Sequence, residues 1–171
     1  MRLFGAVRLS DGVKDALSAA QDELYSRGVR GRFTSAENLH LTLAFIGEYP
    51  EPEAVLEALS AVSFAPFELA LEGMGCFGDL WWAGLADSAP LLSLSQKIRH
   101  ALAKNGIPFD RKRFSPHITL IRNAAGKPPG TAVRPASMTV GAVSLMRSDR
   151  GKKDMIYTEL GTIEATPGCS R

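Results

Sequence analysis

The chain contains the stretch Leu39-His40-Leu41-Thr42-Leu43-Ala44-Phe45-Ile46, and it uses the central pattern again at His117-Ile118-Thr119-Leu120. Both copies read His-x-Thr-apolar, and together they hold two of the 3 histidines of the chain. In each copy apolar residues alternate with polar ones, which is typical of a strand whose two faces have different surroundings. We therefore expect strands at about 39–46 and 117–122, each presenting an imidazole beside a hydroxyl.

Strand geometry predicts which side chains of each copy share a face. Residues two apart lie roughly 6.6 Å apart on one face of a strand, and their neighbours point the other way. The first copy is expected to bury its odd-numbered apolar residues, including Phe45, and to leave the small Ala44 on the open face. Each copy then has its histidine and threonine on the open face: His40 and Thr42, and His117 and Thr119.

Two histidines in equivalent settings indicate acid–base chemistry. Imidazole titrates near neutral pH, so one copy can be neutral while the other is protonated. One histidine can then deprotonate a nucleophile while the other protonates a leaving oxygen. Threonine hydroxyls donate hydrogen bonds to phosphoryl oxygens. A single His-x-Thr pair would more often be two polar residues that satisfy each other, but the repetition favours a shared site around a phosphodiester, whose attacking and leaving oxygens lie in line.

Other chemistries fit the chain less well. A zinc site needs further ligands, and neither copy has a cysteine or carboxylate at a suitable spacing. The sequence lacks the Gly-rich phosphate loop that ends in Lys-Ser/Thr, and it lacks a Gly-x-Ser-x-Gly elbow. We therefore expect no metal and no cofactor.

Composition is that of a globular protein. Of its 171 residues, 45% are hydrophobic and 22% are charged. No apolar run approaches the roughly 20 residues that span a bilayer, and the first residues are too quickly polar for a signal peptide. The isolated Cys76 and Cys169 predict reduced thiols and a cytoplasmic protein. Net charge is only +2, yet basic clusters flank both motifs, which favours a phosphate-bearing ligand: Arg30, Arg32, 111–113, Arg122 and 147–153.

The hydrophobic pattern predicts an α+β protein. Helices are expected at about 11–27, 52–62 and 90–105, and strands at 2–9, 39–46, 67–71, 80–85, 117–122, 137–146 and 155–164. Residues 31–37 are expected to form a turn, 73–78 a glycine-rich bend and 148–154 a charged hairpin loop. His100 falls on the outer stripe of the third helix, and we expect it to be a surface residue. The repeated motif indicates two related halves within one bilobal domain, residues 1–171.

Two segments carry a family resemblance: 37–48 and 114–122 are similar to the two signature segments of the 2H phosphoesterase superfamily. The chain most resembles the bacterial and archaeal RNA 2′,3′-cyclic phosphodiesterases, also called 2′-5′ RNA ligases. The similarity extends to 1–4, 67–69 and 144–148. It implies two pseudo-symmetric lobes whose antiparallel sheets flank a central groove, with helices outside.

The resemblance also implies an activity and a role for each site residue. A terminal 2′,3′-cyclic phosphate would be hydrolysed to a 2′-phosphate without a metal. His40 would protonate the departing 3′ oxygen, and His117 would activate water. Thr42 and Thr119 would hold non-bridging oxygens, and Arg122, five residues after His117, would bind the phosphate. Which histidine is the acid rests on the resemblance alone.

The chain departs from the family at two positions. Phe33 stands where relatives often have Trp, and it keeps an aromatic platform for a base. Ala44 stands where many relatives carry a longer, often basic residue, which would alter RNA contacts. Trp81 and Trp82 would point to opposite faces of a strand; burial is the favoured reading for each, although one can stack on a base. Phe114 fits the groove and the core equally well.

Several functional alternatives stay open. The substrate is expected to be RNA with a 2′,3′-cyclic phosphate end or a small cyclic nucleotide, and the protein a monomer that binds no membrane. Related activities would join or cleave 2′-5′ linkages. A non-catalytic RNA-binding module on the same fold would require a damaged site, whereas both histidines and both threonines are present.

Overall fold

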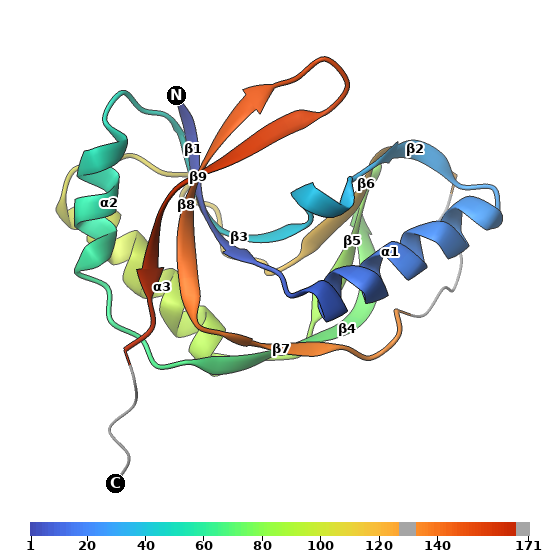
Figure 1. The fold of residues 1–171 in the computed structure, drawn as a ribbon, viewed down its shortest axis with the longest axis horizontal. Helices are drawn as coiled ribbons and strands as arrows, with labels where there is room; N and C mark the ends of the chain where they lie inside the picture. Colours follow the sequence, from blue (N-terminus) through green and yellow to red (C-terminus); the bar gives the residue numbers. More distant parts are fainter. Residues whose placement is uncertain (127–132, 167–171) are drawn as a thin grey trace, which may run out of the picture.

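The structure is a computed structural model that describes residues 1–126 and 133–166 (Figure 1). The described helices are α1 (Asp11–Ser26), α2 (Pro52–Ser60) and α3 (Ala89–Lys104), with a 3₁₀ turn η1 (Ala36–Asn38). The described strands are β1 (Arg2–Arg8), β2 (Arg30–Phe33), β3 (His40–Glu48), β4 (Phe67–Phe77), β5 (Leu80–Leu85), β6 (Ile118–Ala125), β7 (Ser137–Val140), β8 (Ala142–Arg150) and β9 (Met155–Glu164). The predicted α+β class is confirmed.

The strands form two antiparallel sheets. The first sheet has the order β3-β1-β8-β9, and the second has the order β2-β6-β5-β4-β7. The first copy of the motif lies on β3, and the second lies at the start of β6. Each sheet therefore contributes one copy, as the repeat predicts. The two sheets are not successive halves of the sequence, however, because β2 and β4–β7 of the second sheet are inserted among strands of the first.

Helices pack against one face of each sheet (Figure 1). α2 and α3 pack on β9 and β3 of the first sheet, while α1 packs on β6 and β7 of the second. Ser10 and Ser88 cap α1 and α3, because the side chain of each accepts a hydrogen bond from a backbone N–H three residues on. The apolar residues of the motifs, Leu41 and Ile118 among them, are buried under these helices.

Two predicted loop segments are in fact strand. Residues 31–33, expected in a turn, belong to the edge strand β2, where Gly31 has φ 155°. A Cβ at Gly31 would lie 2.8 Å from Ile121 on β6, so glycine is required for this close approach. The predicted bend at 73–78 is mostly strand too, since β4 continues to Phe77 with an irregularity between Leu71 and Met74. The alternation pattern indicated neither, because glycines usually interrupt strands.

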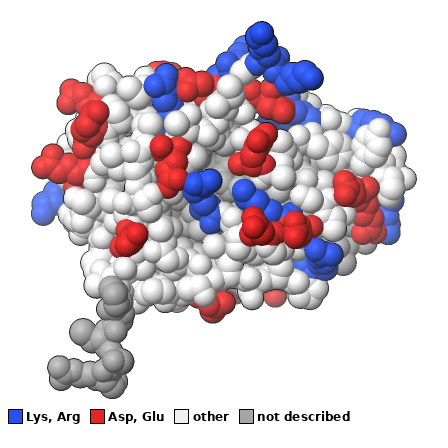
Figure 2. Space-filling view, in the orientation of Figure 1, with Lys and Arg blue, Asp and Glu red and all other residues white. Residues whose placement is uncertain are grey.

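The last predicted strand pair also needs correction. Residues 137–146 form two strands in different sheets: β7 pairs with β4, and after Gly141 the chain enters β8, which pairs with β1 and β9. The charged loop is shorter than predicted, because pairing of β8 with β9 extends to Arg150 and Met155. Figure 2 shows Lys and Arg side chains gathered at the tip of this hairpin.

Three other predictions concern the remaining parts of the chain. Cys76 is exposed and forms no disulfide with a described residue. Cys169 lies outside the described residues. No described helix is long and apolar enough to cross a membrane.

Candidate active site

A cavity of about 510 Å³ lies between the two sheets, and we call it the central cavity. Strands β1, β3, β8 and β9 line it from the first sheet, and β5 and β6 line it from the second. It brings together all five site residues that the sequence indicated: His40, Thr42, His117, Thr119 and Arg122.

Both imidazoles are anchored in the same way. Nδ1 of His40 lies 2.7 Å from the carbonyl oxygen of Asn38, and Nδ1 of His117 lies 2.6 Å from that of Ser115. A carbonyl only accepts, so Nδ1 carries the proton in each ring. Nε2 is then left as the atom that exchanges protons in the cavity. In His40, Nε2 accepts a hydrogen bond from the Thr42 hydroxyl at 2.8 Å.

Aromatic side chains flank both histidines. The ring of His40 lies 5.0 Å from Phe4 and 5.2 Å from Tyr157, and the ring of His117 lies 5.1 Å from Phe77. No pattern in the sequence indicated these three aromatic residues, because they lie far from the motifs along the chain. They restrict the orientation of each imidazole and reduce its contact with water.

A β-bulge follows the threonine in each motif strand. Gly5 and Ala6 of β1 pair with Ala44 and Thr42, which leaves Leu43 as the extra residue of β3. In β6, Ile121 and Thr119 pair with consecutive residues of β5, which leaves Leu120 extra. A bulge shifts the alternation of faces by one residue. Each strand therefore buries two consecutive residues: Leu43 and Ala44, and Leu120 and Ile121.

The bulge overturns two predictions. Ala44 was expected on the open face but is 3% exposed, and Phe45 was expected in the core but is 49% exposed and lines the central cavity. Phe45 and Arg122 thus hold equivalent places, each five residues after a histidine. Ala44 is buried among core residues, and it also lines the cavity beside His117.

The carbonyls of the two bulge residues receive hydrogen bonds from the helices. Ser95 of α3 donates to the Leu43 carbonyl at 3.4 Å, and Gln21 of α1 donates to the Leu120 carbonyl at 3.0 Å. Both polar side chains are buried. One weak signal in the sequence indicates them, namely a polar residue on an otherwise apolar helix stripe.

The surroundings of His40 disfavour its charged form. Burial lowers the pKa of His40 below its usual range, the Asn38 carbonyl opposes that effect, and the positive charges of Arg122 and His117 add to it. His40 is therefore mainly neutral at pH 7 in the free protein. Arg122 forms no salt bridge with a described carboxylate, so its guanidinium is free to bind an anion.

The other aromatic candidates have mixed outcomes. Trp81 is buried at 1% exposure, as predicted. Trp82 is half-buried, packs over Gly75 and lies 6.3 Å from the His117 ring. Phe114 packs against the core and also lines a cavity beside His117. The proposed platform, Phe33, instead packs edge-on against Tyr25 and is not among the described residues that line the central cavity.

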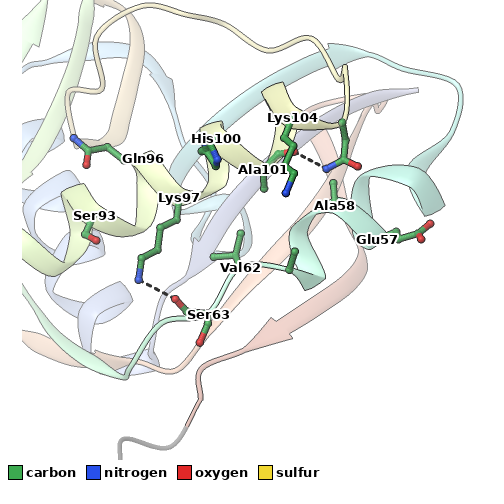
Figure 3. A pocket seen from close by; sticks show the side chains of 12 residues that line it. Glu57, Ala58, Val62, Ser63, Ser93, Gln96, Lys97, His100, Ala101 and Lys104 are labelled. Carbon is green, nitrogen blue, oxygen red and sulfur yellow. Dashed lines mark hydrogen bonds between the residues drawn. The ribbon is translucent and has the colours of Figure 1, made fainter.

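His100 is exposed, as predicted, and lines a different cavity of about 910 Å³ between α2 and α3 (Figure 3). This helix cavity is on the outer side of α3, and Lys97 in it is tied to the Ser63 carbonyl at 2.9 Å. Among residues 1–126 and 133–166, no group of three or more His, Cys, Asp or Glu is placed to hold a metal ion.

The chain is similar in sequence to known proteins. The model of the 2′-5′ RNA ligase superfamily matches residues 10–152. The RNA 2′,3′-cyclic phosphodiesterase of Geobacillus stearothermophilus is 35% identical over 153 residues, which cover 82% of this chain and 49% of that protein. The chain thus spans about half the length of this relative. The RNA 2′,3′-cyclic phosphodiesterase of Thermus thermophilus is 35% identical over 181 residues, covering 94% of this chain and 88% of that protein.

Similarity extends to solved structures. The crystal structure of Escherichia coli LigT complexed with 3′-AMP superposes with a TM-score of 0.83 at 27% identity, and the match covers 96% of this chain and 97% of LigT. The architecture of two antiparallel sheets with outer helices is therefore that of LigT.

Proposed function

This chain belongs to the 2′-5′ RNA ligase superfamily, and we propose that it is an RNA 2′,3′-cyclic phosphodiesterase, like the relatives named above. The observation that carries the proposal is the pair of histidines with matching backbone anchors in one cavity between the sheets. Such a pair supplies a base and an acid to the two ends of one phosphodiester.

The reaction uses the two Nε2 atoms. Nε2 of His117 takes a proton from water while the water oxygen bonds to phosphorus. The bond from phosphorus to the 3′ oxygen breaks, and Nε2 of His40 gives its proton to that oxygen. Thr42, Thr119 and Arg122 donate hydrogen bonds to the non-bridging oxygens, whose negative charge grows in the transition state. The product is a 2′-phosphate, and no metal takes part.

His40 must be protonated when substrate is bound, because it donates a proton to the leaving 3′ oxygen. Its pKa is lowered in the free protein by burial and then by neighbouring positive charges. An anionic phosphate between the histidines offsets those charges and favours the imidazolium. RNA ends are thus expected to bind to a protein with neutral His40 and to bring about its protonation.

We further propose that the protein is a monomer and that residues 1–171 act as one domain.

The test uses an oligonucleotide that ends in a 2′,3′-cyclic phosphate, incubated with the protein and a chelator. The expected product has a 2′-phosphate end, and a small cyclic nucleotide or a 2′-5′-linked dinucleotide is compared at equal enzyme concentration. His40→Ala and His117→Ala should each reduce turnover by about 10²- to 10⁴-fold. His100→Ala is the matched control, since it removes the exposed third histidine. Equal turnover in all three variants would contradict the proposal.

A further inference from the structure

A smaller cavity of about 290 Å³ adjoins the central cavity beside His117, and we call it the side cavity. The two cavities are adjacent, because they share Thr42, Phe45, Asp110 and His117 in their linings. The side cavity is therefore next to the place where a phosphate would lie between the histidines.

Three cations join a mainly apolar lining in the side cavity. Arg99 comes from α3, and Lys112 and Arg113 come from the segment between α3 and β6. None of the three forms a salt bridge with a described carboxylate, and Nε of Arg99 is buried without a hydrogen-bond partner. The one carboxylate of the lining, on Asp110, already accepts the backbone N–H of Lys112 at 3.0 Å. The cavity thus holds a net positive charge that its own residues do not neutralise.

The segment that carries Lys112 and Arg113 is anchored at both ends beside the central cavity. The backbone N–H of Asp110 donates to the carbonyl of Phe45 at 2.8 Å, and the carbonyl of Ser115 accepts Nδ1–H of His117. The backbone that carries Lys112 and Arg113 is therefore anchored beside the catalytic imidazoles, while both side chains are exposed. An anchored backbone loses less freedom when a ligand binds.

We propose that the side cavity is a second phosphate subsite, which binds the 5′-phosphate of the nucleotide whose cyclic phosphate lies between the histidines. In RNA this group is the phosphodiester to the preceding nucleotide. The inference rests on the proposed function for the position of the first phosphate. The guanidinium groups of Arg99 and Arg113 and the ammonium of Lys112 can donate charge-assisted hydrogen bonds to phosphate oxygens. The consequence is a preference for RNA ends over nucleosides that have a free 5′ hydroxyl.

Binding of two reaction products tests the subsite without turnover. Isothermal calorimetry compares adenosine 2′-phosphate with adenosine 2′,5′-bisphosphate. The 5′-phosphate should tighten binding about tenfold or more, as hydrogen bonds to charged groups do. In Lys112→Gln/Arg113→Gln, the gain from the 5′-phosphate should fall to about threefold or less.

Arg111→Gln is the matched control. Arg111 has the same charge and lies in the same segment, but its guanidinium lies 4.6 Å over the ring of Phe109 and is not part of the described cavity lining. This variant should keep the full gain. Equal affinity of the wild-type protein for both products would overturn the subsite, as would equal losses of the gain in both variants, which indicate a general charge effect.

Kinetics separates this inference from the proposed function. Adenosine 2′,3′-cyclic phosphate is compared with and without a 5′-phosphate. Turnover of both at equal kcat/KM retains the activity and overturns the subsite. No turnover of either, together with tighter binding of the bisphosphate, overturns the activity and supports the subsite. A higher kcat/KM for the 5′-phosphorylated compound supports both.

Discussion

Phe45 and Arg122 break the symmetry of an otherwise doubled site. Each lies five residues after a motif histidine and lines the central cavity, and each reaches it because a bulge precedes it. Phe45 presents an apolar ring to the cavity, and Arg122 presents a guanidinium. Of these two side chains, only that of Arg122 can donate hydrogen bonds to a phosphate, so a bound phosphodiester meets unequal surroundings on its two sides.

This inequality leads to a prediction about His40. Its pKa should lie below 6.5 in the free protein and rise when adenosine 2′-phosphate binds, because the anion favours the charged imidazole. Burial has the largest effect on this pKa, but the positive charge of Arg122 contributes. Arg122→Gln should therefore raise the pKa of His40 in the free protein. NMR of the imidazole nitrogens between pH 4 and 9 measures both effects.

Arg111→Gln serves again as the control, since Arg111 is not among the charges that act on His40. If His40 stays neutral in the complex at pH values where the protein is active, the assigned roles are reversed. His40 would then accept the proton from water, and His117 would donate one to the leaving oxygen.

At the level of single residues, the sequence predicted which side chains carry the chemistry better than it predicted how side chains pack. Alternation correctly put His40, Thr42, His117 and Thr119 on open faces, because each motif is regular up to its threonine. It failed at Ala44 and Phe45, since a bulge depends on how β3 pairs with β1 and not on local pattern. The aromatic neighbours of the histidines were missed for the same reason, as they come from other strands.

Among the elements, helices α1 and α3 have matching roles behind the two motif strands. Each supplies one buried polar side chain, Gln21 or Ser95, to the carbonyl of a bulge residue. A bulge disrupts the local ladder, and buried carbonyls need hydrogen-bond donors. The Leu120 carbonyl also accepts the backbone N–H of Thr34 at 2.9 Å, so Gln21 adds a second hydrogen bond there. The Gln21 and Ser95 contacts stabilise the bend of each strand at the point where the next residue turns toward the cavity.

Gln21→Leu should therefore destabilise the protein and impair the site. The Gln21 amide donates to the carbonyls of both Thr34 and Leu120, and leucine fills similar space without a donor. We expect a loss of about 1–3 kcal/mol in the free energy of unfolding, measured in urea, together with lower kcat/KM. The control is Gln96→Leu on the exposed side of α3, which should change stability by less than about 0.5 kcal/mol. Equal effects of the two substitutions would show that the bulge contact is unimportant.

The positions of helices and strands were largely predictable from the sequence, but the pairing of the strands into sheets was not. All three helices were expected near their observed bounds, since their apolar stripes and caps are local signals. The sequence did not indicate that 137–146 divides between two sheets at Gly141, because β7 and β8 have equally strand-like residues. It missed the edge strand β2, whose residues Arg30–Phe33 are mostly exposed and so have no apolar pattern.

At the scale of the whole molecule, the two sheets share an apolar core. The chain passes from one sheet to the other four times: between β1 and β2, β2 and β3, β3 and β4, and β7 and β8. One continuous apolar core contains residues of both sheets, including Leu145 of β8 and Trp81 of β5. Neither sheet can therefore form from an uninterrupted piece of chain, and the central cavity exists only when both are folded.

We accordingly predict one cooperative unfolding transition. The fluorescence of Trp81 and Trp82 reports on the second sheet, since both lie on β5. Leu145→Ala opens a cavity in the first sheet, where Leu145 is fully buried, and should cost about 2–5 kcal/mol. In urea, the fluorescence midpoint of the variant should fall together with the midpoint of far-UV circular dichroism. If the lobes unfold independently, the tryptophan transition keeps its wild-type midpoint while part of the dichroism signal shifts. The two-sheet site would then be assembled from separable domains, and the histidines of a partly unfolded protein would no longer face each other.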